Sequence, residues 1–236
     1  MKKLLLLLLF TCGCGSAFAN PILVLNGSTY YSGTKNSESC IAVIGESTSS
    51  VSCDVYYELT KEPNTSLDSH YVYVALPVFI LSSDSTTDEK LTDIFVPRLE
   101  FKGRIIAPNF GNKPMRIRNR PELQEFKAPA GTDVVLFGFT VKVGVNQQNA
   151  HFLVRYTQPM INGKFLYMPL FEGSKAPSGK GPYRLEALAF DPSWSLVATK
   201  TPNDRTFASR VSFDLSKQDL IELKLKKQPN QKTEMW

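Results

Sequence analysis

Histidine is almost absent from this chain of 236 residues, because His70 and His151 are the only two that it contains. Two histidines cannot supply a zinc motif of the H-E-x-x-H type or a metal site with several histidine ligands. The chain also lacks the G-x-S-x-G sequence that presents the nucleophile of many serine hydrolases. It has no acidic cluster with the spacing of a calcium-binding loop. The sequence therefore predicts no metal, no cofactor and no catalytic residue.

Cysteine is scarce too, and its positions are informative. Of four cysteines, Cys12 and Cys14 lie close to the N-terminus, which leaves Cys40 and Cys53. These two form no C-x-x-C pair, which disfavours a redox or metal-binding role. In an antiparallel hairpin that turns at residues 46–47, Cys40 lies directly opposite Cys53. We expect a disulfide there, which stabilises the fold by ~3 kcal/mol in the chain-entropy model for a loop of about 14 residues.

Long hydrophobic runs are missing as well. The N-terminal run over residues 4–10 is too short to cross a bilayer, which needs about 20 apolar residues. It follows Lys2 and Lys3, and residues 17–19 fit the small-x-small pattern of a cleavage site. This arrangement predicts an export signal peptide over residues 1–19 rather than a membrane anchor.

The chain that would remain after cleavage is only mildly basic. It has 217 residues, with 25 basic and 22 acidic side chains, because the signal holds two lysines and no acid. Such a balance does not favour nucleic acid as a partner. We expect an exported protein, either periplasmic or secreted. The alternative is a lipid-anchored envelope protein modified at Cys12 or Cys14, although the residues before each cysteine match the lipoprotein pattern poorly.

The clearest strand pattern covers residues 134–170. Apolar side chains alternate with polar or small ones over residues 137–145 and again over residues 152–157. The dipeptide Asn162-Gly163 is a strong signal for a hairpin turn. These features predict a three-stranded meander. Many short strands with turn signals and little helix predict an all-β protein, an antiparallel β-sandwich of two packed sheets.

The predicted meander contains a conflict of charge. If Val145 lies opposite Phe152, then Lys142 lies opposite Arg155, and directly opposed like charges are unfavourable. A register shifted by two residues would place Thr140 opposite Arg155 instead. We therefore expect the shifted register, or an acid from a neighbouring strand between the two cations.

The domain organisation depends on residues 108–130. This stretch holds four prolines and has weak periodicity, as expected of a long crossover or of a linker. We expect a single large domain over residues 20–227, with two domains divided within residues 108–130 as the alternative. Residues 228–236 are predicted to form a loose C-terminal tail.

The strongest surface signal is a basic stretch that begins at Arg98 and has Glu100 as its only internal acid. In an extended segment, alternating arginines lie on one face and could bind an anion. The candidate anion-binding residues are Lys102, Arg104, Lys113, Arg116, Arg118 and Arg120. The alternative is a solvated strand edge whose charges resist aggregation.

Three functions are compatible with these patterns. We favour an exported, non-catalytic protein with a binding or assembly role in a bacterial-type cell envelope, whose partner is an anionic envelope component or another envelope protein. A second hypothesis is an envelope polysaccharide hydrolase with two carboxylates paired in space, drawn from Glu58, Glu172 and Glu186. A third is a two-domain periplasmic chaperone or adhesin-like protein, suggested by chain length and by residues 108–130.

Overall fold

The computed structural model describes residues 23–25, 32–60, 70–83, 86–116, 130–144, 146–169, 181–199, 209–217 and 220–228. Within these ranges lie the strands β1 to β14, the helix α2 and a short 3-10 helix, η3. No helix in this part of the chain is long and apolar enough to span a membrane. The predicted signal peptide and the residues of the predicted tail beyond position 228 lie outside the described residues.

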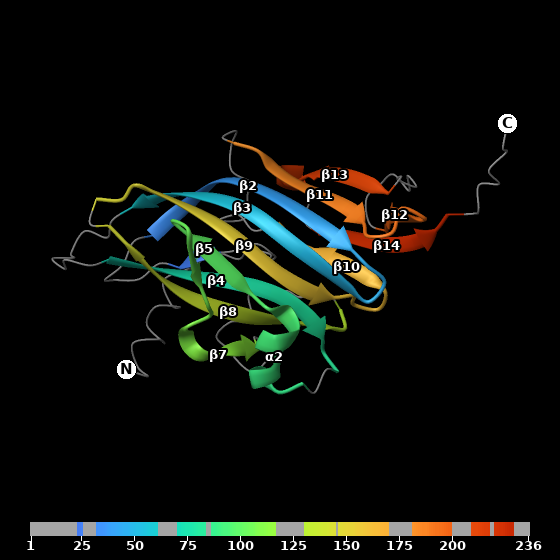
Figure 1. Ribbon diagram of the computed structural model, residues 1–236, viewed down its shortest axis with the longest axis horizontal. Helices are drawn as coiled ribbons and strands as arrows, with labels where there is room; N and C mark the ends of the chain where they lie inside the picture. Colours follow the sequence, from blue (N-terminus) through green and yellow to red (C-terminus); the bar gives the residue numbers. More distant parts are fainter. Residues whose placement is uncertain are drawn as a thin grey trace.

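The described strands form three sheets (Figure 1). The seven-stranded sheet has the order β13 (Arg210–Asp214), β11 (Tyr183–Ala189), β2 (Ser32–Ile44), β3 (Thr48–Thr60), β9 (Asn149–Pro159), β5 (Arg98–Phe101), β6 (Arg104–Ile106). The four-stranded sheet has the order β1 (Leu23–Leu25), β4 (His70–Leu81), β8 (Thr132–Val143), β7 (Phe110–Arg116). The three-stranded sheet has the order β10 (Lys164–Tyr167), β14 (Ile221–Lys227), β12 (Trp194–Ala198). The helices are α2 (Asp88–Phe95) and η3 (Leu215–Lys217).

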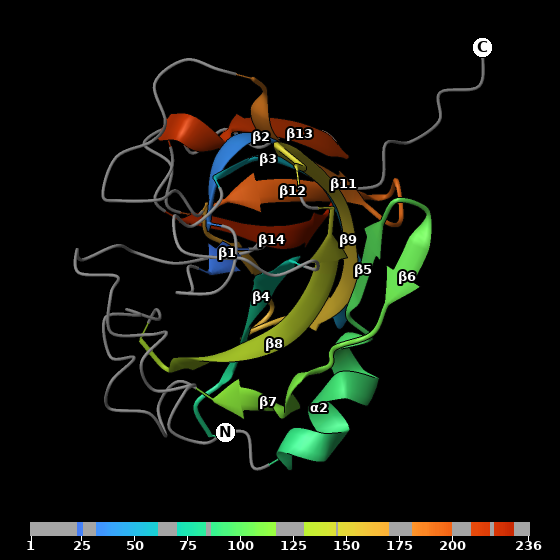
Figure 2. The same ribbon diagram turned by 90° about the vertical axis from the view of Figure 1, so that its left-hand side faces the viewer.

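The all-β prediction is confirmed at the level of class, since strands dominate and α2 is the one α-helix among the described residues. Most strand pairs are antiparallel, but β11 runs parallel to β2, so the seven-stranded sheet is mixed. One hydrophobic core joins side chains from all three sheets, such as Val55 of β3, Phe137 of β8 and Phe165 of β10. Figure 2 shows the long strands β9 and β8 curving around this shared interior.

The prediction of a meander over residues 134–170 is wrong. Strands β8, β9 and β10 lie in three different sheets. β8 pairs with β4 along its whole length, and β9 pairs with β3 and β5. Alternation fixes which side chains point inward but not which strand lies alongside, and here the long partners β4 and β3 come from earlier in the chain. The expected conflict between Lys142 and Arg155 does not arise, because Lys142 lies opposite Tyr71.

The predicted β2–β3 hairpin is confirmed. Cys40 lies directly opposite Cys53, and the two form a disulfide. The turn closes with a hydrogen bond from the Gly45 backbone N–H to the Thr48 carbonyl oxygen, at 2.9 Å. A Cβ atom at Gly45 would lie 2.9 Å from that oxygen, so the turn requires glycine at this position. Along β3 the side chains alternate between buried and solvent-facing, which gives the seven-stranded sheet one inner and one outer face.

Helix α2 brings the chain to the outer edge of this sheet. Its side chains Leu91 and Phe95 are fully buried in the core, and the Phe95 ring packs on Phe137. The helix ends at Phe95 and is capped by Val96, whose backbone has φ 42° and donates its N–H to the Thr92 carbonyl oxygen. This left-handed residue turns the chain directly into β5, two residues later.

The division into domains remains a prediction. Of the stretch 108–130, residues 117–129 lie outside the described residues, and β7 within it pairs with β8. The third functional hypothesis, which depends on two domains, therefore stays a prediction too.

Candidate functional site

The outer face of the seven-stranded sheet carries an open groove with a volume of about 280 Å³. It crosses β2, β3 and β9 and ends at the segment between α2 and β5. Its lining consists of Ile41, Val43, Ser50, Val51, Ser52, Val96, Arg98, Arg155, Tyr156 and Thr157. No acidic residue is among these lining residues, so the charges within the groove are all positive.

Strand alternation creates the apolar floor of this groove. Ile41 and Val43 are outward-facing positions of β2, and Ile41 is 49% exposed. They lie opposite Ser52 and Ser50 of β3, whose short side chains leave the hollow beside them. Val96, 42% exposed, stands at the far wall because the end of α2 places it there.

Two arginines face each other at the same wall. Arg98 of β5 lies directly opposite Arg155 of β9, and both side chains are exposed. Neither arginine side chain forms a hydrogen bond or ion pair with any residue that the structure describes. Directly opposed like charges destabilise a strand pair. The arrangement therefore costs free energy in the ligand-free protein, and an anion between the two guanidinium groups would offset that cost.

Nearby acids do not neutralise this pair. Glu186 is engaged by Arg210, and Asp54 lies 2.5 Å from His151 through Oδ1 and Nε2. Glu100 shares a face of β5 with Arg98, two residues along the strand, but its side chain forms no ion pair with a described residue. One carbonyl oxygen in the last turn of α2 is also occupied, since Thr157 donates its hydroxyl to the Ile94 oxygen at 2.6 Å.

The candidate anion-binding residues from the sequence do not gather into one described site. Lys102 donates to Gln147 Oε1 at 2.8 Å, and Arg104 is exposed on the edge strand β6. Arg116 is only 4% exposed and donates to the Thr86 carbonyl oxygen, so it does not form part of an exposed comb. The side chain of Lys113, together with Arg118 and Arg120, lies outside the described residues. Anion binding at those positions stays a prediction.

The structure also separates the described carboxylates proposed for a hydrolase. Glu186 of β11 lies level with Ser52 of β3 across the sheet, and Glu58 is six residues further along β3. Six residues span about 20 Å, whereas paired glycosidase carboxylates lie within about 10 Å. Glu172, the third candidate, lies outside the described residues.

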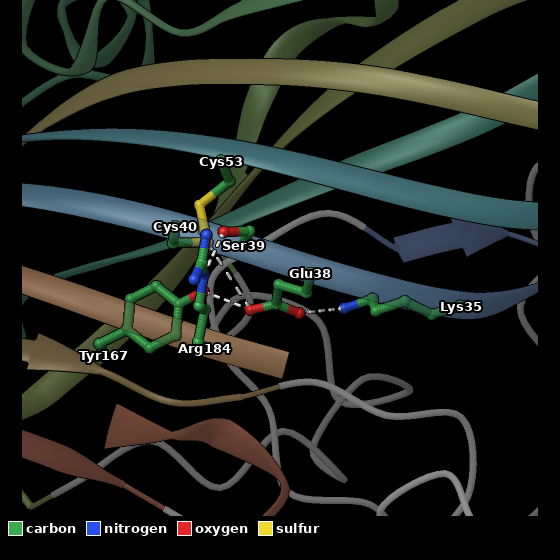
Figure 3. Close-up of a disulfide and its surroundings, with 7 residues drawn as sticks. All are labelled: Lys35, Glu38, Ser39, Cys40, Cys53, Tyr167 and Arg184. Atoms are coloured by element: carbon green, nitrogen blue, oxygen red, sulfur yellow. Dashed lines mark hydrogen bonds and ion pairs between the residues drawn. A yellow bond between two sulfur atoms is a disulfide. The ribbon is translucent and has the colours of Figure 1, made fainter. Parts of the chain in front are cut away.

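A second polar cluster lies on the inner face of the same sheet (Figure 3). The Lys35 ammonium is 2.9 Å from Glu38 Oε2, and both side chains are buried. A β-bulge between Lys35 and Ser37 makes this pair possible, because it brings residues three apart onto the same face of β2. Glu38 then continues the inward series of Cys40 and the residues beyond it.

Tyr167 of β10 links this ion pair to the disulfide. Its hydroxyl donates a hydrogen bond to Glu38 Oε1 and lies 3.0 Å from the Cys40 sulfur. Burial raises the pKa of Glu38, although the Lys35 ammonium and the Tyr167 hydroxyl act in the opposite direction. Burial and the Glu38 carboxyl also raise the pKa of Tyr167. The cluster is closed to solvent in the described structure, which suits a structural role better than binding.

The sequence patterns did not single out either group of residues. Glu38 lies two residues before Cys40, so strand alternation places both on the inner face. No local sequence signal indicates the β-bulge that brings Lys35 to the same face. The sequence predicts Thr140 opposite Arg155, or an acid between Arg155 and Lys142, whereas the opposition of Arg155 to Arg98 depends on the pairing of β5 with β9. That pairing joins segments more than fifty residues apart, which periodicity does not specify.

No protein-family model matches the chain, and no curated protein matches it. Among solved structures, it is similar to the crystal structure of a protein from Legionella pneumophila described as a candidate nutrient binding protein. The two are 9% identical, with a TM-score of 0.40, and the match covers 89% of this chain and 70% of that chain. A likeness of this degree carries no argument about function.

Proposed function

We propose that this chain is an exported, non-catalytic β-sandwich protein with a binding role in a bacterial-type cell envelope. The groove on the outer face of the seven-stranded sheet is its binding site. The observation that carries this proposal is the opposed pair Arg98 and Arg155, which lacks an acidic partner among the described residues and borders an apolar floor.

The disulfide supports the exported location. A bond between Cys40 and Cys53 persists in an oxidising compartment and is rare in the cytosol. The pattern of residues 1–19 supports the same location, since a short apolar run after two lysines and before a small-x-small site is typical of a signal peptide.

The groove chemistry indicates an occupant with two parts. A guanidinium group binds carboxylate, sulfonate or phosphate oxygens through two parallel hydrogen bonds. An anionic group placed between Arg98 and Arg155 would therefore interact with both. An apolar part of the same occupant would cover Ile41 and Val43, which water contacts in the free protein.

A titration with anilinonaphthalene sulfonate, an apolar anion, tests the proposed function. Backbone amide signals of the mature protein should shift at Ile41, Ser52 and Arg155 more than elsewhere, and the apparent affinity should fall as salt concentration rises. The variant Arg155→Gln should bind the probe more weakly, whereas Lys142→Gln should not, because Lys142 is exposed but lies on β8, outside the groove. Shifts scattered over the surface, or none, would remove the groove as a binding site.

A further inference from the structure

We propose that the natural occupant of the groove is an acidic segment of another protein, which places one carboxylate between Arg98 and Arg155 and lays apolar side chains along β2 and β11. This inference rests on the proposed function and adds the chemical class of the partner. It follows from the extent of the apolar surface, the openness of the groove and the charges around it.

The apolar surface continues beyond the groove. Leu188 of β11 lies directly opposite Val43 of β2 and is half-buried. Phe190 follows the end of β11, donates its N–H to the Ile44 carbonyl oxygen at 2.9 Å, and is 78% exposed. We call Ile41, Val43, Leu188 and Phe190 the apolar stripe. It runs from the arginine pair across two strands to the tip of the β11–β12 connection.

The stripe and the groove fit a protein better than a small ligand. Pockets for small ligands usually have volumes of about 300–1,000 Å³ and enclose most of the ligand. This groove has about 280 Å³, lies open on a sheet face and leaves Phe190 outside it. Exposed aromatic residues and arginines beside a hydrophobic surface are typical of protein interfaces, where such residues contribute most of the binding free energy.

The charges on the outer face favour an acidic protein segment over a second copy of the chain or an anionic membrane. A second copy of the chain that docked by the same face would bring a second arginine pair toward the first. A membrane with anionic lipids would attract Arg98 and Arg155 but would also meet acids on the same face, such as Asp54, Glu100 and Asp214. A single carboxylate contacts the arginine pair alone, whereas a flat anionic surface would also cover Glu100 and Asp54, which lie level with Leu153 in the next row of the same face.

One carboxylate that contacts both guanidinium groups predicts a specific mutational pattern. Removing either arginine removes one contact to the carboxylate, and the remaining arginine alone no longer holds the carboxylate in position. The effects of Arg98→Gln and Arg155→Gln should therefore be strongly non-additive. Two independent anion contacts would instead give effects that multiply.

Calorimetric titration with two synthetic peptides tests the inference. One peptide alternates glutamate with valine, and the other replaces every glutamate with glutamine. The glutamate peptide should bind the mature protein at least about tenfold more tightly, given the strength of charge-assisted hydrogen bonds. Arg98→Gln and Arg155→Gln should each weaken its binding about tenfold, and the double variant only slightly more. Lys142→Gln is the matched control and should bind like the wild type, because Lys142 is an exposed cation on β8, away from the groove and the stripe.

The variant Phe190→Ser tests the stripe independently. It should weaken the glutamate peptide several-fold without changing the affinity for anilinonaphthalene sulfonate in the groove. Equal binding of the two peptides, or multiplicative losses in the double arginine variant, would overturn the acidic-segment inference. So would tighter binding to phosphatidylglycerol vesicles than to the glutamate peptide, or self-association that the arginine variants abolish. In each of these cases the proposed function stands if the sulfonate still binds, and it fails with the inference if the sulfonate does not.

Discussion

Arg98 of β5 and Arg155 of β9 lie directly opposite each other, and their positive charges repel. This repulsion lowers the free energy of unfolding of the ligand-free protein. Replacing Arg155 with Gln should therefore raise the free energy of unfolding by ~0.2–1 kcal/mol. For a chain of this length, 1 kcal/mol corresponds to an increase of about 2–4 °C in Tm. Thermal unfolding of the ligand-free variant, compared with the wild type, measures this effect.

The control for this prediction is Arg104→Gln, because Arg104 lies opposite Phe101 rather than opposite another cation. Its Tm should not change. If Arg155→Gln were less stable than the wild type, a partner would already hold the Arg155 guanidinium in the free protein. In the proposed site, Arg155 binds the anion but destabilises the free protein. Arg155→Gln should therefore raise the stability and lower the affinity.

The buried carboxyl of Glu38 predicts a pH dependence of stability. Its pKa in the folded protein lies above the ordinary value of 4.5, chiefly because of burial. The folded state therefore holds this proton more tightly than the unfolded state does. The contribution of Glu38 to stability is fully present at a pH below 4.5 and decreases as pH rises through the folded-state pKa.

The variant Glu38→Gln isolates this contribution, because glutamine keeps the shape and cannot ionise. The free energy of unfolding of the wild type, minus that of the variant, should fall as pH rises above 4.5 and then level off. Urea denaturation over a series of pH values gives this difference. Glu58→Gln, at an exposed position of β3, is the control for the substitution itself. A difference that increases with pH would mean that attraction to Lys35 outweighs burial.

At the scale of strands, alternation predicted which side chains point inward but not which strands pair. The β2–β3 hairpin was predictable because its two strands are adjacent in sequence and the cysteines fix the register. The neighbours of β8 and β9 were not, because each pairs with a strand from far earlier in the chain. The groove depends on those distant pairings. Its apolar floor on β2 could be read from the sequence, whereas the opposition of Arg98 to Arg155 could not.

The bulge in β2 depends on close contact with the start of β11. A Cβ atom at Gly181, where φ is +84°, would lie 2.4 Å from the Asn36 carbonyl oxygen within the bulge. Gly181→Ala should therefore destabilise the protein by ~1–2 kcal/mol for the left-handed backbone and by a further ~1–3 kcal/mol for the collision. Gly163→Ala is the matched control, because Gly163 has φ +69° and nothing within 4 Å of the added atom.

Chemical denaturation of the two variants separates strain from collision. Gly163→Ala should show the backbone cost alone, and Gly181→Ala should show both. The Tyr183 hydroxyl donates a hydrogen bond to the Lys35 carbonyl oxygen at 2.9 Å. In Gly181→Ala this hydrogen bond should break, and the pKa of Tyr183 should fall. Equal destabilisation by the two substitutions would mean that the bulge adjusts freely to the added methyl group.

At the scale of the molecule, three sheets share one core, and the polar groups inside it are held by one another. Lys35, Glu38 and Tyr167 satisfy each other beside the disulfide, as buried polar groups must. The outer face shows the reverse arrangement, with an apolar stripe and two opposed arginines in contact with water. This contrast supports the proposed partner on the outer face, since folding alone would favour the arrangement seen inside.

The proposed export would place the proposed partner outside the cytoplasm, and it gives the last prediction. Cleavage after Ala19 would leave a chain of 217 residues that begins at Asn20 and carries one disulfide. The intact mass of the protein from the cell envelope measures this, before and after reduction. Replacing Cys12 and Cys14 with serine should leave that mass unchanged, whereas Ala19→Arg should retain residues 1–19. A mass that shows a lipid on Cys12 or Cys14 would instead anchor the protein to a membrane and restrict the acidic partner to that surface.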